Sequence, residues 1–439
     1  MRQLPLNISF SKHTLANGLE VLLHEDHACP IVAVNVWYHV GSKNERPGHT
    51  GFAHLFEHLM FEVSQHYDRG YFHPLAGAGA SLNGSTNTDR TNYWEVVPTN
   101  ALELALWMES DRMGYLLPAL TDAKFFNQRD VVLNERRQNY ENRPYGLASM
   151  AVPAALFPPD HPYHWTTIGE VADLNAVRLD EVQAFFRRYY HPANASLALA
   201  GDVDPEAALA LVGAHFDDIE AGERVDPVRA QAALDGEARI RLEDRVELPR
   251  LYLAWLTPAL FADGDADLDL ATDLLANGKT SRLYRRLVFE ERVATDVSAV
   301  QNSREMASFV QMAATAAPGH TLSEIERAMV EEIARLGAEG PTDDEIERGR
   351  VQAEAQFLFR LQTVGGFGGK SDQLNAYNVF LGDPGYFDRD LARYRGETRA
   401  SIQHAVQRYL DPLRRVTLSV VPRSRAELAI PDSTPVAVS

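Results

Sequence analysis

The chain is organised around one apolar stretch, Gly51-Phe52-Ala53-His54-Leu55-Phe56-Glu57-His58-Leu59-Met60-Phe61. Its only polar side chains are those of His54, Glu57 and His58. On an α-helix, residues four apart lie one turn apart on the same face, so both imidazoles can point at one metal ion with Glu57 beside them. This is the geometry that a catalytic zinc site needs.

The chemistry of zinc says what else the site requires. A catalytic zinc keeps three protein ligands and an open position for water, whose pKa the metal lowers toward ~7. Two histidines leave one ligand to come from elsewhere, usually a carboxylate, and Glu57 would then be the general base. The alternative is that these histidines are hydrogen-bonded core residues. Two His and a Glu among Phe, Leu and Met are costly to bury without a shared partner, which favours the metal.

Composition limits the class of protein. The chain has 439 residues, of which 45% are apolar and 23% charged, which indicates a soluble globular protein of more than one domain. Its net charge of −19 argues against nucleic acid or an anionic membrane as a partner. The single cysteine, Cys29, excludes an internal disulfide framework and a cysteine zinc site. No signal-peptide core or membrane-spanning run is visible, so we expect a cytoplasmic protein, or a periplasmic one if a leader was removed.

The N-terminal half is expected to form a mixed sheet with helices against it. The Asn17-Gly18 pair lies between strand-like flanks in residues 13–24 and predicts a β-hairpin. Apolar periodicity predicts further strands and helices. The strands are expected at 31–40, 80–87, 91–98 and 195–201, and the helices at 101–117, 122–142 and 180–190.

The second half resembles a diverged repeat of the first. Trp37 and Trp255 follow Glu25 and Glu243 at the same interval, an offset of 218 residues, and the strand endings of the two halves also agree. The span 220–238 is charged and poor in apolar residues, as in a linker. We therefore predict an α+β fold of two structurally similar domains, each a mixed β-sheet flanked by helices. Their expected bounds are 1–220 and 239–439, with a linker at 221–238.

The predicted metal site occurs only once. Carried forward by 218 residues, the three motif positions fall on residues that cannot repeat the site. These residues are Thr272, Leu275 and Ala276.

Together, these features carry a family resemblance. The HxxEH motif, the 76 residues between His58 and Glu135, the Asn83-Gly84 strand and the duplicated halves resemble the pitrilysin/insulysin family of zinc peptidases. Within that family the chain is most similar to short two-domain subunits such as mitochondrial processing peptidase and its bacterial relatives. The motif is the inverzincin signature. The resemblance covers essentially the whole chain.

The resemblance implies a role for each matching residue. His54, His58 and Glu135 would bind one zinc ion per chain, and Glu57 would be the base. Asn83 and Gly84 would lie on an edge strand to which an extended peptide adds by backbone pairing. Turn chemistry alone leaves a simple turn open at Asn83-Gly84.

Two departures from the family pattern concern catalysis. Seven residues before the third ligand the family commonly has a Glu, whereas this chain has Gln128, so an outer carboxylate is missing or replaced. In the C-terminal half, Val288 and Thr295 stand where the family has an Arg and a Tyr that reach the substrate. The resemblance therefore implies a hetero-oligomer with a homologous subunit that lacks the metal motif and supplies the Arg and Tyr. A homodimer with substitute groups is the alternative.

The resulting prediction is a zinc-dependent endopeptidase that hydrolyses extended, unfolded peptides inside a closed chamber. A non-catalytic assembly subunit of a larger complex is the alternative, against which the intact motif and Glu135 argue. A metal-dependent hydrolase acting on something other than peptides has no feature here to support it.

Other motif-like features are given structural interpretations. The segment 363–371 ends in Gly-Lys-Ser but follows an expected helix at 343–361, whereas a phosphate-binding loop must follow a strand. It is interpreted as a flexible loop that interrupts a helix. The loop histidines show no ligand spacing and are expected to be structural or surface residues. They are His161, His164 and His191.

Overall fold

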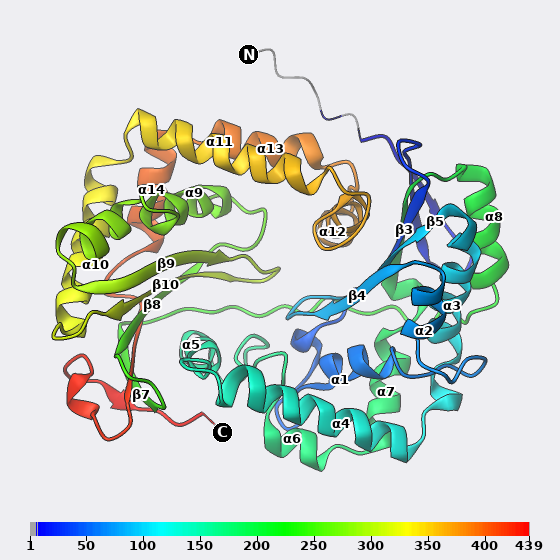
Figure 1. Cartoon of the computed structure of the whole chain (residues 1–439), viewed down its shortest axis with the longest axis horizontal. Coiled ribbons are helices and arrows are strands. Elements are labelled where there is room, and N and C mark those ends of the chain that lie inside the picture. Colours follow the sequence, from blue (N-terminus) through cyan, green and yellow to red (C-terminus); the bar gives the residue numbers. More distant parts are fainter. Residues whose placement is uncertain (1–5, 7, 439) are drawn as a thin grey trace. The chain divides into compact units, whose positions relative to one another are not determined.

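The computed structural model describes residue 6 and residues 8–438 (Figure 1). The chain forms two six-stranded mixed sheets, each flanked by helices. This confirms the predicted α+β class with two similar sheet domains.

The first sheet has the strand order β1-β2-β6-β3-β5-β4. β2 and β6 are parallel, and the other neighbouring strands are antiparallel. β3 and β6 lie at its centre with nearly all side chains buried, and β4 forms one edge. The strands are β1 (Ser11–Thr14), β2 (Glu20–Glu25), β3 (Ile31–Tyr38), β4 (Ser81–Thr86), β5 (Thr91–Pro98) and β6 (Ala195–Gly201).

The second sheet repeats this arrangement. Its order is β12-β7-β11-β8-β10-β9, with β7 parallel to β11 and the order β11-β8-β10-β9 antiparallel throughout. Five strands thus correspond in order and direction to β2-β6-β3-β5-β4, which confirms the predicted duplication. The strands are β7 (Ala238–Asp244), β8 (Arg250–Thr257), β9 (Ala294–Asn302), β10 (Ser308–Ala316), β11 (Val416–Pro422) and β12 (Thr434–Pro435).

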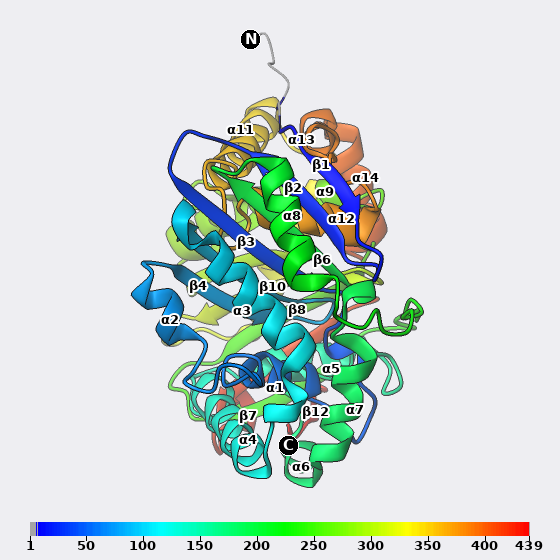
Figure 2. The same ribbon diagram turned by 90° about the vertical axis from the view of Figure 1, so that its right-hand side faces the viewer.

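Four helices of the first half lie where the sequence predicts them, and the other four were not predicted. The expected helix at 122–142 is α-helical only to Arg136 and continues as a π-helical turn, η4 (Arg137–Glu141). Figure 2 shows α3 and α8 across the first sheet, where they contact β3 and β2 respectively. The helices are α1 (Phe52–Leu59), α2 (Phe72–Gly77), α3 (Leu102–Tyr115), α4 (Asp122–Arg136), α5 (Ala148–Leu156), α6 (Val171–Ala176), α7 (Leu179–Tyr189) and α8 (Pro205–Phe216).

The second half contributes six helices to the described part of the chain and a second π-helical turn, η6 (Tyr284–Glu290). The glycine-rich segment 363–371 joins two of these helices, α11 and α12, as the sequence predicts. In the part that the structure describes, no helix is long and apolar enough to cross a membrane. The helices are α9 (Asp265–Ala276), α10 (Leu322–Glu339), α11 (Asp343–Arg360), α12 (Lys370–Leu381), α13 (Phe387–Gly396) and α14 (Arg399–Tyr409).

The chain divides into two compact units that are not continuous in sequence. The first comprises Met1–Asn134, Thr166–Val228 and Gln356–Arg389, and the second Glu135–Trp165, Arg229–Ala355 and Asp390–Ser439. Residues 217–237 contain no helix or strand. The sequence analysis predicts two domains, 1–220 and 239–439, joined by a linker at 221–238. That each of them folds on its own stays a prediction.

The discontinuity arises because each half gives one helix to the other half's sheet. α5, from the first half, contacts β8 and β11, whereas α12, from the second half, contacts β2, β3 and β6. Asp372 of α12 fixes this packing. Its Oδ1 accepts hydrogen bonds from Trp37 Nε1 at 2.8 Å and from Asn92 Nδ2 at 2.9 Å.

The duplication is confirmed, but the register predicted from Trp37 and Trp255 is wrong. Trp37 lies on the face of β3 that α12 covers. On β8, Ala254 belongs to the core cluster formed with α5, whereas Trp255 belongs to the cluster formed with α9, α10 and α14. Because successive side chains of a strand point to opposite faces, the two tryptophans are not equivalent positions.

The same correction applies to the metal motif. α1 and α9 both begin after a glycine with positive φ, Gly51 at 88° and Gly264 at 93°. Aligned by these glycines, the three motif positions correspond to Asp267, Leu270 and Ala271 instead of the predicted residues. The second half still does not repeat the motif.

Candidate metal centre

α1 presents the metal motif because its apolar and polar residues lie on two different faces. Phe56 is fully buried, with its ring centroid 5.2 Å from that of Tyr190 and 5.4 Å from that of Phe186. Phe52, Leu55 and Leu59 are buried on the same side. The opposite face is partly exposed and carries His54, Glu57 and His58.

The start of α1 is held by the carboxyl group of a residue from outside the helix. Gly51 precedes the helix with φ of 88°, and Glu45 accepts hydrogen bonds from the amides of Gly51 at 2.9 Å and Ala53 at 2.8 Å. These amides have no partner within the helix. Burial raises the pKa of Glu45 to about 8, against the opposing effect of the two amide hydrogen bonds.

A second contact fixes the same end of the helix. A Cβ atom on Gly169 would lie 2.5 Å from the Cα of Gly51, so only glycine fits at position 169. Asp173 accepts hydrogen bonds from the amide of Thr50 at 3.0 Å and from its hydroxyl at 2.7 Å. The segment that carries His54 is therefore anchored on two sides.

The structure brings together the three residues that the sequence predicts as ligands. One donor atom each of His54, His58 and Glu135 lies within 4.8 Å of the other two. The imidazole centroids are 4.8 Å apart, and their planes meet at 83°. Among the described residues, no other set of three His, Cys, Asp or Glu side chains gathers in this way.

These residues fit a zinc ion. Bonds of about 2.1 Å in a tetrahedral site place the donors about 3.4 Å from one another, which small side-chain movements from the observed positions would achieve. Two neutral imidazoles and one carboxylate are also a donor set found at catalytic zinc. All three side chains are partly exposed, so a fourth position can remain accessible to water.

Glu135 reaches the site from the last turn of α4. The helix changes to the π-helical turn η4 directly after Arg136, and Asn139 in that turn donates a hydrogen bond to Glu135 Oε1 at 3.2 Å. Burial raises the pKa of Tyr140 in the same turn, and the charge of Glu135 adds to the rise. Short π-helical turns of this kind occur frequently at functional sites.

A cavity of about 490 Å³ opens beside Glu57 and His58. Its apolar wall is formed by Phe61 and Phe72, whose rings stack with centroids 4.7 Å apart. The remaining lining residues are polar or glycine. They are Glu62, Arg69, Gly70, His73 and Gln128.

The structure explains how the departure at Gln128 is accommodated. Gln128 is 7% exposed, and its Nε2 donates a hydrogen bond to Glu62 Oε1 at 2.5 Å. Glu62 lies just beyond the end of α1 and lines the same cavity as Glu57. A carboxylate is therefore present next to position 128, supplied by Glu62.

The predicted substrate-binding residues lie on an edge strand. β4 pairs only with β5, and no described strand pairs with its other side. A Cβ atom on Gly84 would lie 2.9 Å from Cε2 of Phe61, so a larger residue here would displace the Phe61 ring. Asn83 is exposed, and its Oδ1 accepts a hydrogen bond from the amide of Gly84 at 2.9 Å.

Arg90 is a charged neighbour of Glu57 that the sequence analysis did not find. Its Nη1 donates to the carbonyl oxygen of Ser85 at 2.8 Å, and its guanidinium lies 5.2 Å from the ring centroid of Trp37. Burial lowers the pKa of Arg90, while the charges of Asp372 and Glu57 oppose that change. Arg90 is the last residue of the turn between β4 and β5. Nothing in the sequence links this turn to the metal motif.

Neither of the two positions that the resemblance matches to an Arg and a Tyr contains a guanidinium or a phenol. Val288 lies in η6 and packs against the hydrophobic core, and Thr295 is exposed on β9 with its hydroxyl 3.1 Å from Asp296 Oδ2.

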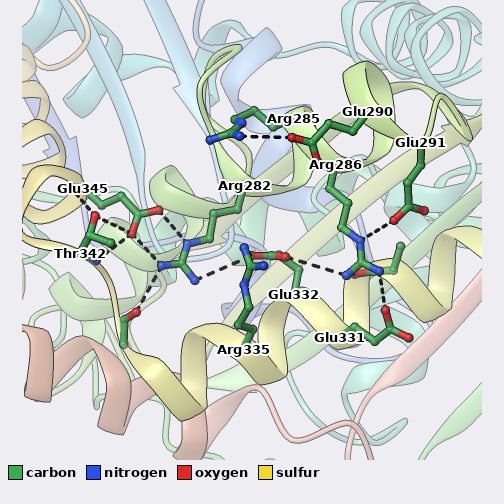
Figure 3. A network of polar contacts seen from close by, with 12 residues as sticks. Arg282, Arg285, Arg286, Glu290, Glu291, Glu331, Glu332, Arg335, Thr342 and Glu345 are labelled. Carbon is green, nitrogen blue, oxygen red and sulfur yellow. Dashed lines mark hydrogen bonds and ion pairs between the residues drawn. The ribbon is translucent and has the colours of Figure 1, made fainter.

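The arginines of this segment are engaged elsewhere. Figure 3 shows Arg282 in a two-point ion pair with Glu345, with both nitrogen–oxygen distances 2.7 Å. Arg286 pairs with Glu291 at 2.7 Å and with Glu331. Burial alone would raise the pKa of Glu345, but hydrogen bonds from Arg282 and Thr342 lower it to about 2. These arginines therefore stabilise the fold around η6.

Two family profiles match successive parts of the sequence. The profile described as Insulinase (Peptidase family M16) matches residues 20–161, and the profile described as Peptidase M16 inactive domain matches residues 176–352. The chain belongs to peptidase family M16, the pitrilysin/insulinase family. The presence of one candidate metal centre, in the first half, agrees with the names of these two profiles.

Known M16 relatives are similar over most of their length. The "Zinc protease PqqE" of Helicobacter pylori is 28% identical over 358 residues, which cover 80% of each chain. An "uncharacterized zinc protease" of Mycobacterium leprae is 30% identical over 278 residues, 62% of each chain.

Solved M16 structures share the fold. A protease from Helicobacter pylori superposes with a TM-score of 0.85 at 25% identity, covering 94% of this chain and 100% of that one. The periplasmic protease PqqL of Escherichia coli superposes with a TM-score of 0.77 at 18% identity, covering 97% of this chain and 49% of that one.

Proposed function

We propose that this M16 protein is a zinc-dependent endopeptidase that hydrolyses extended, unfolded peptides in a closed chamber. The observation that carries the proposal is the convergence of His54, His58 and Glu135, with Glu57 on the same face of α1. The zinc-protease names of its relatives support the same conclusion.

The proposed chemistry divides between the metal and Glu57. A zinc ion held by His54, His58 and Glu135 would polarise the scissile carbonyl and lower the pKa of water toward ~7. Glu57 borders the cavity beside His58, where its carboxylate can accept a proton from the attacking water. The same carboxyl then passes the proton to the leaving amine.

The free edge of β4 would hold the peptide. The amide of Asn87 donates to the carbonyl of Arg90 at 3.0 Å, which makes these residues a hydrogen-bonded pair. Hydrogen-bonded and non-hydrogen-bonded pairs alternate along an antiparallel ladder. The backbone groups of Leu82, Gly84 and Thr86, which belong to non-hydrogen-bonded pairs, therefore point away from β5. A bound peptide would pair with these three residues and replace Asn83 Oδ1 at the amide of Gly84.

The missing Arg and Tyr would come from a second protein. With Val288 and Thr295 at the corresponding positions, the chain has neither the guanidinium nor the phenol that would stabilise the carbonyl oxygen there. One such donor is typically worth ~3 kcal/mol of barrier. We therefore propose that the chain is the metal-bearing subunit of a hetero-oligomer with a homologous subunit that lacks the metal motif. A homodimer with substitute groups is the alternative.

Metal analysis and peptide cleavage together test the proposal. The purified protein is expected to contain one zinc ion per chain and to cleave a quenched peptide until a chelator removes the metal. Glu57→Gln is expected to retain zinc and to lose at least about a hundredfold in rate, whereas His58→Ala loses the metal itself. A Glu57→Gln protein that cleaves normally would overturn the assignment of the base.

The same assay separates the alternatives. Adding the homologous subunit is expected to raise the rate of the wild-type chain but not of Glu57→Gln. Zinc-free protein that stays assembled with a partner and shows no cleavage would instead favour an assembly subunit. The expected cytoplasmic location stays a prediction that fractionation of the host cell tests, because a solved relative is described as periplasmic.

A further inference from the structure

The glycine-rich segment between α11 and α12 brings an exposed aromatic ring to the first sheet. Residues 365–369 are four glycines around Phe367. The segment belongs to the same compact unit as β4 and β5. The Phe367 side chain is 48% exposed, and neither the packing of the fold nor the proposed zinc chemistry uses it.

Hydrogen bonds and glycine conformations fix the path of this segment. The amide of Lys370 donates to the carbonyl oxygen of Thr363 at 3.0 Å, which closes the loop, and the amide of Gly368 donates to Asp372 Oδ2 at 2.7 Å. Gly366 and Gly368 have φ of 84° and 77°, a region that other residues rarely adopt. The backbone that presents the ring is therefore specified by the glycine on each side of it.

The segment lies against the face of the first sheet that α12 covers. A Cβ atom on Gly365 would lie 2.6 Å from Cβ of Ala33 and 2.6 Å from Cγ2 of Val96, so no side chain fits between the segment and the strands β3 and β5. Trp94, two residues before Val96, projects from the same face of β5. The ring of Phe367 meets it edge to face, with centroids 5.5 Å apart and planes at 86°.

This face of the sheet ends at the free edge of β4. Trp94 lies opposite Asn83 in the register of β4 and β5, and side chains directly opposite each other project from the same face. The side chains of β4 on this face are short and polar, namely Ser81, Asn83 and Ser85. Because neighbouring strands lie about 4.8 Å apart, a peptide paired with β4 would run about 10 Å from β5. A long peptide side chain can cross β4 at that distance and reach the two rings.

We propose that Phe367 and Trp94 form a subsite for an apolar side chain of the peptide substrate. That side chain belongs to the peptide residue paired opposite Asn83, while alternate residues point to the other face, where Phe61 packs against β4. The inference rests on the proposed binding of an extended peptide to β4. Single exposed apolar side chains are common on protein surfaces, but this one is held by a glycine loop beside a free strand edge.

Two peptides test the subsite without cleavage. Both carry fluorescein and consist of serine, are about ten residues long so that they span the six residues of β4, and differ in one central phenylalanine. Fluorescence anisotropy measures their binding to the zinc-loaded full chain carrying Glu57→Gln, which is expected not to cleave them. This chain is expected to bind the phenylalanine peptide about tenfold more tightly than the all-serine peptide.

Two matched variants locate the preference. Phe367→Ala in the same chain is expected to bring the two affinities within about twofold of each other. A general disturbance of the fold would weaken both peptides alike and leave their ratio unchanged. Phe359→Ala removes another ring, 65% exposed near the end of α11, and is expected to keep the tenfold preference. Circular dichroism of each variant checks that the fold is retained.

The outcomes separate this inference from the proposed function. If the Glu57→Gln chain binds neither peptide at millimolar concentration, the proposed peptide site on β4 is wrong and the subsite is wrong with it. If it binds both peptides equally, peptide binding stands and the subsite is wrong. A full preference retained in Phe367→Ala, or lost equally in Phe359→Ala, would also overturn the assignment of Phe367.

Discussion

Glu45 accepts a hydrogen bond from the amide of Ala53, the residue next to His54, across 2.8 Å. The other carboxyl oxygen of Glu45 accepts from the amide of Gly51 at 2.9 Å. One side chain thus caps the N-terminus of α1 and fixes the turn that carries His54, the first proposed ligand. The geometry of the metal centre therefore depends on a residue outside the HxxEH motif.

Replacing Glu45 is expected to weaken zinc binding. Glu45→Ala leaves two amides of α1 without their acceptor and should lower the free energy of unfolding by about 2 kcal/mol. Loss of a residue that orients ligands typically costs 10- to 100-fold in metal affinity. Competition with a fluorescent zinc chelator measures the affinity, and urea unfolding of the metal-free protein measures the stability.

Two variants show whether the loss of zinc affinity and stability comes from the hydrogen bonds that Glu45 accepts at the start of α1. Glu45→Gln retains one acceptor oxygen and should recover part of the zinc affinity. Glu347→Ala removes an exposed carboxylate on α11 and should change neither quantity. If Glu45→Ala folds and binds zinc as tightly as the wild type, Glu45 does not position the ligands.

Gly84→Ala is expected to slow peptide cleavage without removing the metal. The new methyl group would lie 2.9 Å from Phe61 and 3.0 Å from Tyr93, so the Phe61 ring has to move. Phe61 borders the cavity beside Glu57, and misplacing groups there should reduce kcat/KM by at least about tenfold. Zinc content and kcat/KM are measured together, with Ser81→Ala at an exposed position of β4 as the control.

Local signals in the sequence were sufficient for the strands of the first sheet and for four helices of the first half. The Asn17-Gly18 turn predicts the hairpin that joins β1 and β2, and the long β-branched run in residues 31–40 predicts β3. The HxxEH spacing places both histidines on one helical face, as observed in α1. These features depend on neighbours within one or two turns of the chain, which is why the sequence shows them.

Features that depend on distant neighbours were not predictable. The exchange of α5 and α12 between the two sheets leaves no local signal, because each helix has ordinary helical periodicity. The offset from Trp37 to Trp255 matched in number but was wrong in register, since the two residues lie on opposite strand faces. Arg90 reaches the surroundings of Glu57 only through the pairing of β4 with β5.

The contact between Asp372 and the first sheet offers a test of the exchanged helix. Oδ1 accepts from Asn35, Trp37 and Asn92, and Oδ2 accepts from the amide of Gly368 at 2.7 Å. Asp372→Asn replaces one acceptor oxygen by an NH₂ group and leaves buried donors facing each other. The free energy of unfolding in urea is expected to fall by about 2–3 kcal/mol.

A control distinguishes this contact from a general effect of charge. Asp388→Asn changes the same charge at a residue outside the Asp372 contact and should alter the free energy of unfolding by less than about 0.5 kcal/mol. Equal stability of Asp372→Asn and the wild type would mean that α12 does not depend on this carboxylate.

The ion pair of Arg282 and Glu345 predicts a stability difference that depends on pH. Hydrogen bonds from Arg282 and Thr342 lower the pKa of Glu345 from 4.5 to about 2 in the folded chain. A carboxyl whose pKa is lowered on folding stabilises the fold above its unfolded pKa, and this contribution is lost as the pH falls toward the folded pKa. Glu345→Gln should therefore lower the free energy of unfolding by about 2 kcal/mol at pH 7, allowing for solvent screening, and by progressively less between pH 4.5 and 2.

Urea unfolding at pH 7, 4.5 and 3 measures this difference. Glu290→Gln breaks the exposed pair with Arg285 and is the control, which should have little effect at any pH. A cost for Glu345→Gln that is the same at all three pH values would show that the Arg282 ion pair is not what stabilises this part of the fold.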